Sequence, residues 1–202
     1  MFHKFIALFL VSFITLQAST WEEYKEDTLK NHHKIPGWCK REKAEKLMNL
    51  IHDTRPKVSV EIGVYRGSST YPIAKALQYI RRGVIYAVDP WDKDESLKFE
   101  ADEANRECWG NIDYEKTYKK FLKMVKKNKL KSYCKVLRAT SEKAFAQFRD
   151  GSVDFIHIDG NHNEESCTKD VEMSLKKLKK GGYLLFDDAN WHQTKKAVDY
   201  LK

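Results

Sequence analysis

Two short acidic segments are the part of this sequence whose residue types point most directly to chemistry. Asp159-Gly-Asn-His162 ends one apolar run, and Asp187-Asp188-Ala-Asn190 ends another. If the two runs are neighbouring strands of a parallel sheet, three carboxylates meet at one edge, and such a group is hard to keep ionised without a cation among them. Carboxylate and amide oxygens suit a hard ion such as Mg²⁺, Mn²⁺ or Ca²⁺. The predicted metal ligands are Asp159, Asp187 and Asp188; the alternative is that one caps a helix and another pairs with a lysine.

His162 is the candidate general base. It lies three residues beyond Asp159 on the loop, within reach of a hydroxyl bound to a metal at that edge. We therefore predict His162 and Asp159 as the catalytic pair, against the alternative that His162 is structural. His157 lies inside the expected strand and is interpreted as a core residue.

A glycine-containing turn is the candidate ligand-binding segment. The sequence Glu61-Ile-Gly-Val-Tyr-Arg-Gly67-Ser68 follows an apolar run and precedes a helix. Its two glycines allow the backbone to approach a ligand closely. Tyr65 replaces the middle glycine of the dinucleotide fingerprint, which leaves less room for a pyrophosphate. Glu61 suits a cationic ligand better than a diphosphate.

Polar residues after the next two apolar runs extend this candidate site. Asp89 ends the second run, where a carboxylate can accept hydrogen bonds from a ribose diol. Thr140 and Ser141 follow the third run and suit an adenine edge. The alternative is that Ser141, or Thr140 next to it, is only a helix N-cap.

The elements that must position these residues alternate along the chain. Strands are expected over residues 58–64, 84–89, 134–140, 153–160 and 183–188. Helices are expected over residues 41–52, 68–80, 114–125, 141–148, 164–180 and 192–202. Continuous apolar strands alternating with helices indicate an α/β fold with a parallel sheet covered on both faces, whose ligands bind at the carboxyl ends of the strands. Residues 90–112 are expected to form an irregular lid.

Composition agrees with one globular domain. The chain has 202 residues, 42% of them hydrophobic, and a net charge of +8. Its aromatic content of 12% excludes a disordered chain. The lysine-rich stretch 116–131 carries its charges on the outer face of an amphipathic helix, so no nucleic-acid partner is expected.

Residues 1–18 are typical of a secretory signal. His3 and Lys4 precede an apolar stretch at 5–16 and a small residue, Ala18. The stretch is shorter than the ~20 residues that span a bilayer, so no stable membrane span is expected. We predict export of a mature domain over 19–202, with a cytoplasmic chain as the alternative. In an exported chain the four cysteines can pair in any of three ways; in the cytoplasm they stay thiols.

Four segments together resemble a known family. EIGVYRGSST, IYAVDPW, IHIDGNH and GGYLLFDD, in this order and spacing, resemble the Rossmann-like, class I S-adenosylmethionine-dependent methyltransferases. The greatest likeness is to the branch labelled methyltransferase family 24, near the macrolide and sugar O-methyltransferases, and it runs from about residue 35 to 191. It implies a doubly wound sheet of strand order 3-2-1-4-5.

The resemblance also implies roles for the candidate residues. Glu61, Gly63, Gly67 and the adjacent Ser68 shape the methionine end of the cofactor site, and Asp89 holds the ribose. Mg²⁺ lies on Asp159, Asp187 and Asp188, with His162 as acid or base. The function expected is Mg²⁺-assisted methyl transfer to a hydroxyl of a small molecule such as a sugar or polyketide.

Two features depart from the family pattern. Such methyltransferases continue with an antiparallel hairpin beyond the fifth strand, whereas this sequence ends at Lys202 in the preceding helix. The fifth strand is then expected to be an exposed edge, in a truncated protein or one whose edge a second copy covers. The signal-like start would separate the protein from its cytoplasmic methyl donor. The alternative function is an exported, non-catalytic remnant that still binds the cofactor; a nicotinamide-linked oxidoreductase is disfavoured by Tyr65.

Overall fold

A computed structural model describes residues 19–100 and 102–202, so the predicted signal segment lies outside the described residues. The core is one sheet of strands β1 (Val58–Ile62), β2 (Val84–Asp89), β3 (Cys134–Arg138), β4 (Val153–Ile158) and β5 (Leu178–Phe186). The strand order is β3-β2-β1-β4-β5 and every neighbouring pair is parallel. This confirms the predicted Rossmann-like fold.

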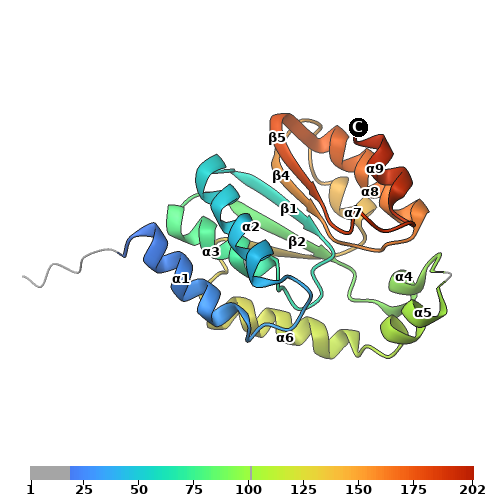
Figure 1. The fold of residues 1–202 in the computed structure, drawn as a ribbon, viewed down its shortest axis with the longest axis horizontal. Helices are drawn as coiled ribbons and strands as arrows, with labels where there is room; N and C mark the ends of the chain where they lie inside the picture. Colours follow the sequence, from blue (N-terminus) through green and yellow to red (C-terminus); the bar gives the residue numbers. More distant parts are fainter. Residues whose placement is uncertain (1–18, 101) are drawn as a thin grey trace, which may run out of the picture.

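Helices cover both faces of the sheet (Figure 1). One side carries α1 (Trp21–His32), α2 (Arg41–Thr54), α3 (Thr70–Ile80) and α6 (Tyr114–Lys127). The other carries α7 (Ser141–Phe145), α8 (Glu164–Lys177) and α9 (Lys195–Tyr200). Two apolar cores result, one around Leu47, Leu77 and Phe121 and one around Phe145 and Val171. Because strand side chains alternate between the faces, Val60 and Ile62 join the second core while Glu61 points to the other face, where it contacts Thr70 of α3.

The boundaries differ from the predicted ones near β5. The helix expected over 164–180 ends at Lys177, and the strand expected from 183 begins at Leu178. Lys177 is anchored by Asp150, with 2.7 Å between Nζ and Oδ1, and the chain pairs with β4 directly afterwards. A register shift opposite Val153 and Phe155 lets the strand continue through two glycines. Tertiary pairing thus overrides the helical pattern of the sequence.

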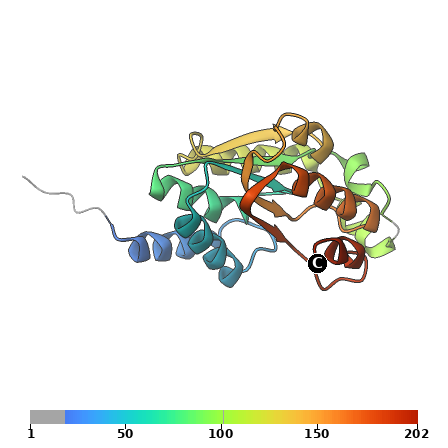
Figure 2. The same cartoon turned by 90° about the horizontal axis from the view of Figure 1, so that it is seen from above.

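The segment expected to be an irregular lid contains two short helices, α4 (Lys93–Leu97) and α5 (Glu103–Gly110). Asp92 and Asp102 cap them by accepting hydrogen bonds from backbone N–H groups. Both helices lie beyond the carboxyl end of the sheet in two views (Figures 1 and 2). Trp91 is not part of a lid: it is 1% exposed and its ring packs against Tyr118 and Phe121.

Three other expectations bear on the surface and the thiols. In the described sheet β5 is an edge strand, as expected, and Tyr183 on it is 46% exposed. Within residues 19–100 and 102–202, no helix has both the length and the apolar character needed to cross a bilayer. All four cysteines, which lie in the described part of the chain, are free thiols.

Candidate active site

A cavity of about 580 Å³ opens at the carboxyl edge of the sheet. Most of the predicted site residues line it: Gly63, Ser68, Asp89, Thr140, Ser141, Asp159, His162, Asp187 and Asp188. The backbone ladder extends past the strand ends, because Gly63 N–H donates to the Val88 carbonyl and Asp159 N–H to that of Ile62. The fold therefore brings residues from the ends of all five described strands to one space.

Asp89 organises the turn after β1. Its Oδ2 accepts the backbone N–H groups of Val64 at 3.0 Å and Tyr65 at 2.8 Å, and its Oδ1 accepts that of Trp91 at 2.7 Å. Burial raises the pKa of this carboxyl, although the three N–H donors oppose the shift. A carboxylate offers about four lone-pair positions, so one is left on Oδ1 for a ligand.

The two glycines of the turn have different structural roles. A side chain on Gly63 would meet the Asp159 carbonyl oxygen at 1.9 Å, so glycine here lets the turn pack directly on the end of β4. A side chain on Gly67 would meet Phe121 and Met124 of α6 within 2.8 Å. Gly67 is outside the cavity lining and serves the packing of α6, whereas Gly63 faces the cavity.

Glu61 does not reach the cavity. Its side chain is fully buried and accepts hydrogen bonds from the Thr70 hydroxyl and, through Oε1 at 2.9 Å, from His157 Nδ1. Glu61 therefore lies below the turn and orients His157, so the structure does not place it at the methionine end of a cofactor. His157 is a satisfied buried residue, as its position inside β4 indicated.

Thr140, not Ser141, is the N-cap of α7, because its hydroxyl accepts the backbone N–H of Lys143 at 3.4 Å. Both residues face the cavity together with Asp170 of α8. Asp170 is 5% exposed, and burial raises its pKa to about 7, against a hydrogen bond from Ser141. The cavity thus has a buried carboxyl group, that of Asp170, at the end lined by Thr140 and Ser141.

The acid cluster of Asp159, Asp187 and Asp188 has a lysine partner, as the alternative interpretation of the sequence allowed, although no pattern singled out Lys43. Lys43 of α2 places its Nζ 3.0 Å from Asp159 Oδ2 and also hydrogen-bonds Asp187 Oδ2. Burial lowers the pKa of the Lys43 amine, but the two carboxylates outweigh it and the pKa is raised overall. For Asp187 burial acts upward and Lys43 more strongly downward, so its pKa is lowered. Burial and the charge of Asp187 raise the pKa of Asp159 despite His157 and Lys43.

His162 and Asp188 form the other end of the acid cluster. His162 Nε2 lies 2.8 Å from Asp188 Oδ2, and among the described residues this buried nitrogen makes no hydrogen bond. The His162 ring packs on Trp191 with 4.7 Å between centroids. Asp188 has a left-handed φ of +50°, which turns its carboxylate from that of Asp187 toward His162.

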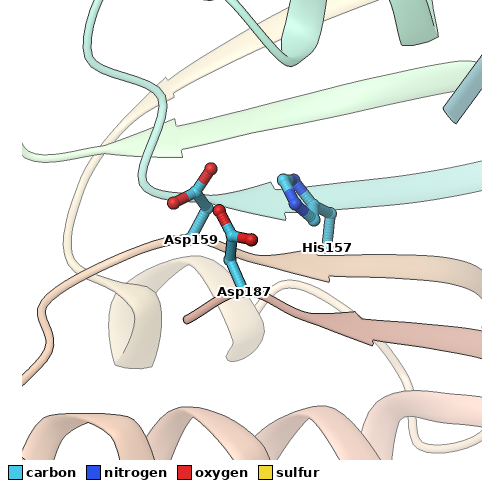
Figure 3. Close-up of side chains that lie close together, drawn as sticks. All are labelled: His157, Asp159 and Asp187. Atoms are coloured by element: carbon cyan, nitrogen blue, oxygen red, sulfur yellow. The ribbon is translucent and has the colours of Figure 1, made fainter. Parts of the chain in front are cut away.

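Two groups of side chains have the donor set for a divalent cation. They are His157, Asp159 and Asp187 (Figure 3), and Asp159, His162 and Asp188. Carboxylate oxygens and an imidazole nitrogen with no hydrogen bond fit a cation such as Mn²⁺ or Mg²⁺. The residues present therefore fit a metal, but the ammonium of Lys43 already contacts the carboxylates of the first group.

An aromatic trio closes the cavity on the side of the glycine turn. Trp38 lies 5.1 Å from Tyr65 and 5.4 Å from Trp109 of α5, measured between ring centroids. Trp38 is 65% exposed. The loop after β4 also contacts α4, because the Asn161 side chain donates a hydrogen bond to the Ser96 carbonyl at 3.2 Å.

Sequence reasoning missed Lys43, Asp170 and Trp38. Lys43 stands beside the apolar stripe of an ordinary amphipathic helix, and Asp170 lies in a helix rich in charged residues. No local pattern sets either apart, because their partners come from other layers of the fold. Trp38 had one usable signal: it is an aromatic residue directly after a Pro-Gly turn.

Comparisons with known proteins agree with this geometry. A family described as a methyltransferase domain matches residues 60–189, which is more than half of the chain. The uncharacterized protein y4gI of Sinorhizobium fredii is 28% identical over 145 residues, which are 70% of this chain and 14% of that protein. The chain therefore spans a small part of that relative.

Solved structures share the fold. The O-methyltransferase NovP has a TM-score of 0.68 at 14% identity, over 89% of each chain. The S-adenosylhomocysteine-bound methyltransferase PaMTH1 of Podospora anserina has a TM-score of 0.57 at 16% identity, over 82% of this chain and 62% of that one. With the family match and the sheet order, the chain belongs to the methyltransferase-domain family, among the class I S-adenosylmethionine-dependent methyltransferases.

Proposed function

We propose that this protein transfers the methyl group of S-adenosylmethionine to a hydroxyl of a small acceptor such as a sugar or polyketide. The observation that carries the proposal is the meeting of two segments at Gly63. The turn bound by Asp89 packs, through Gly63, on the backbone of Asp159. A cofactor held by the turn then has its sulfonium beside the acid cluster. The bound S-adenosylhomocysteine of PaMTH1, on the same fold, supports the choice of cofactor.

The cofactor would occupy the side of the cavity formed by β1, β2 and β3. The free lone pair on Asp89 Oδ1 accepts a ribose hydroxyl while the other positions keep the turn in place. Thr140 and Ser141 line the cavity beside Asp170, at the end where the adenine would lie. The Gly63 backbone leaves room for the methionine portion.

The acceptor would lie between the acid cluster and the aromatic trio. His162 Nε2 is buried and has no hydrogen-bond partner among residues 19–100 and 102–202, so it can take the hydroxyl proton. Asp188, 2.8 Å away, stabilises the imidazolium that forms. The acceptor oxygen bonds to the methyl carbon as the carbon–sulfur bond breaks, which leaves a methyl ether and S-adenosylhomocysteine. Trp38, Tyr65 and Trp109 offer an apolar aromatic surface to the acceptor.

A divalent cation such as Mg²⁺ is part of the proposal. Asp159, Asp187 and Asp188 would hold it, which leaves the imidazole of His162 free to act as the base. When bound, it lowers the pKa of a coordinated hydroxyl. The chain's own contribution is to position the acceptor and cofactor and to remove the proton.

The test is methyl transfer measured by mass spectrometry. The protein is incubated with ¹³C-methyl S-adenosylmethionine, Mg²⁺ and a panel of sugars and phenolic polyketides, and labelled methyl ethers are sought. His162→Gln should lower the rate about 10²- to 10⁴-fold, while His192→Gln, an exposed histidine, should not. Cofactor binding without any labelled product would favour the exported, non-catalytic alternative. Export itself is tested by finding a mature N-terminus near Ser19 outside the cytoplasm.

The exposed edge of β5 supports one more proposal, that a second copy of the chain covers it. Light scattering at increasing protein concentration tests this, with a dimer expected and a monomer at all concentrations contradicting it.

A further inference from the structure

Lys43 lies where a cation would be expected. α2 buries Ala44, Leu47 and Ile51 in the core, which fixes the helix and aims Lys43 at the sheet edge. From there the ammonium contacts one oxygen of Asp159 and one of Asp187, the carboxylates at the ends of two neighbouring strands. The Lys43 side chain is 25% exposed, so a path to solvent remains.

These two carboxylates are also two of the five candidate metal ligands. The group of His157, Asp159 and Asp187 shares both of them with Lys43, whereas the group of Asp159, His162 and Asp188 shares only Asp159. An ammonium and a divalent ion in contact with the same oxygens would repel each other strongly in a partly buried site. Lysine has a flexible four-carbon stem, so its ammonium can withdraw while α2 stays in place.

We propose that Lys43 is an internal cation that competes with a divalent metal for Asp159 and Asp187, so that metal binding displaces its ammonium. The inference rests on the metal part of the proposed function. It predicts that Asp159 and Asp187 stay paired with a cation when no metal is bound, and that the affinity of the protein for metal is lower than its carboxylates would otherwise give.

The experiment uses Mn²⁺ as the probe and the full chain. Mn²⁺ affinity is measured by electron paramagnetic resonance for wild type, Lys43→Gln and Lys46→Gln. Lys46 lies on the same helix and is exposed, so its variant makes the same charge change away from the cluster. Lys43→Gln should bind Mn²⁺ about 10- to 100-fold more tightly than wild type, and Lys46→Gln should bind like wild type. Equal affinity in the two variants, weaker binding by Lys43→Gln, or no Mn²⁺ binding by any of the three would overturn the proposal.

A second measurement needs no substitution. Wild type is treated with an amine-acetylating reagent with and without saturating Mn²⁺, and the modification of Lys43 and Lys46 is quantified by mass spectrometry. Displacement predicts that Mn²⁺ increases the labelling of Lys43 relative to Lys46. Unchanged or reduced relative labelling contradicts it, even if Lys43→Gln does not fold.

S-adenosylhomocysteine binding, measured separately by calorimetry, distinguishes this inference from the proposed function. Loss of the Mn²⁺ effect with cofactor binding intact removes only the role of Lys43. Failure to bind cofactor, with Mn²⁺ affinity still raised in Lys43→Gln, removes methyl transfer and leaves the competition standing.

Discussion

The two sides of the cavity neutralise their carboxylates in different ways. On the side of β1 and β2, Asp89 receives three backbone N–H groups, which cannot leave without unfolding the turn. On the side of β4 and β5, Asp159 and Asp187 share one lysine side chain, which can swing away. The difference indicates a rigid site for the cofactor beside an adjustable site for a cation and an acceptor.

Asp170 provides a third case, because no ion pair reaches it in the described part of the chain. It is buried, and its pKa is raised to about 7. The three environments therefore differ in what stabilises the ionised carboxyl: backbone N–H groups for Asp89, a mobile lysine for Asp159 and Asp187, and the Ser141 side chain for the buried Asp170. Each makes a different prediction.

The largest effect is expected where the two sides touch. Gly63→Ala should destabilise the protein by about 4 kcal/mol or more, because the new carbon would overlap the backbone of Asp159. Gly151 also has a positive φ but open space around it, so Gly151→Ala should cost only about 1 kcal/mol of backbone strain. Urea unfolding of both variants measures the difference; equal losses would mean that the two sides are not in contact through Gly63.

The second prediction concerns burial without an ion-pair partner. Since the folded-state pKa of Asp170 is above the unfolded value, the folded protein binds more protons between about pH 4 and 7, and its free energy of unfolding falls as pH rises through that range. Asp170→Asn should remove this loss and stabilise the protein by roughly 2 to 4 kcal/mol at pH 8, with no gain at pH 4 or below.

Glu172→Gln, an exposed change on the same helix, is the control for Asp170→Asn and should leave the pH profile unchanged. Unfolding measured by urea from pH 4 to 8 gives both profiles. A constant difference between wild type and Asp170→Asn across this range would contradict the raised pKa.

Asp89→Asn tests the backbone-donor side. The amide places its own N–H₂ group against backbone N–H groups, so we expect a loss of about 2 kcal/mol in stability and a fall of at least tenfold in S-adenosylhomocysteine affinity. Asp113 caps α6 on the surface, where asparagine caps equally well, so Asp113→Asn should change neither quantity. If Asp89→Asn matches this control in calorimetry and thermal unfolding, Asp89 organises neither the turn nor the ligand.

The smallest effect is the change in stability expected when a metal binds at the ends of β4 and β5. Millimolar Mg²⁺ should stabilise wild type by about 1 kcal/mol, as expected when the ion is only a few times above its dissociation constant, and EDTA should reverse the gain. Asp188→Asn should abolish the stabilisation because it removes a carboxylate ligand that does not already pair with Lys43. Thermal unfolding with and without Mg²⁺ checks this; an unchanged gain in Asp188→Asn means that Asp188 does not bind the ion.

Patterns within single segments predicted the fold and the edge that holds the cavity. Alternating apolar strands and amphipathic helices specify a parallel sheet, and the residues after each strand then fall at one edge by geometry. The sequence could not show which way Glu61 points or that Lys43 reaches Asp159, because these contacts join layers far apart in the chain. Of the two N-cap candidates for α7, Ser141 and Thr140, the structure shows Thr140, a one-residue choice that is the usual uncertainty of a helix end.

The most direct measurement of the central claim is a calorimetric titration of the full chain with S-adenosylhomocysteine. A nucleoside site formed by the Gly63 turn and Asp89 predicts saturable heat with one site per chain at micromolar ligand. No heat at millimolar ligand would contradict it.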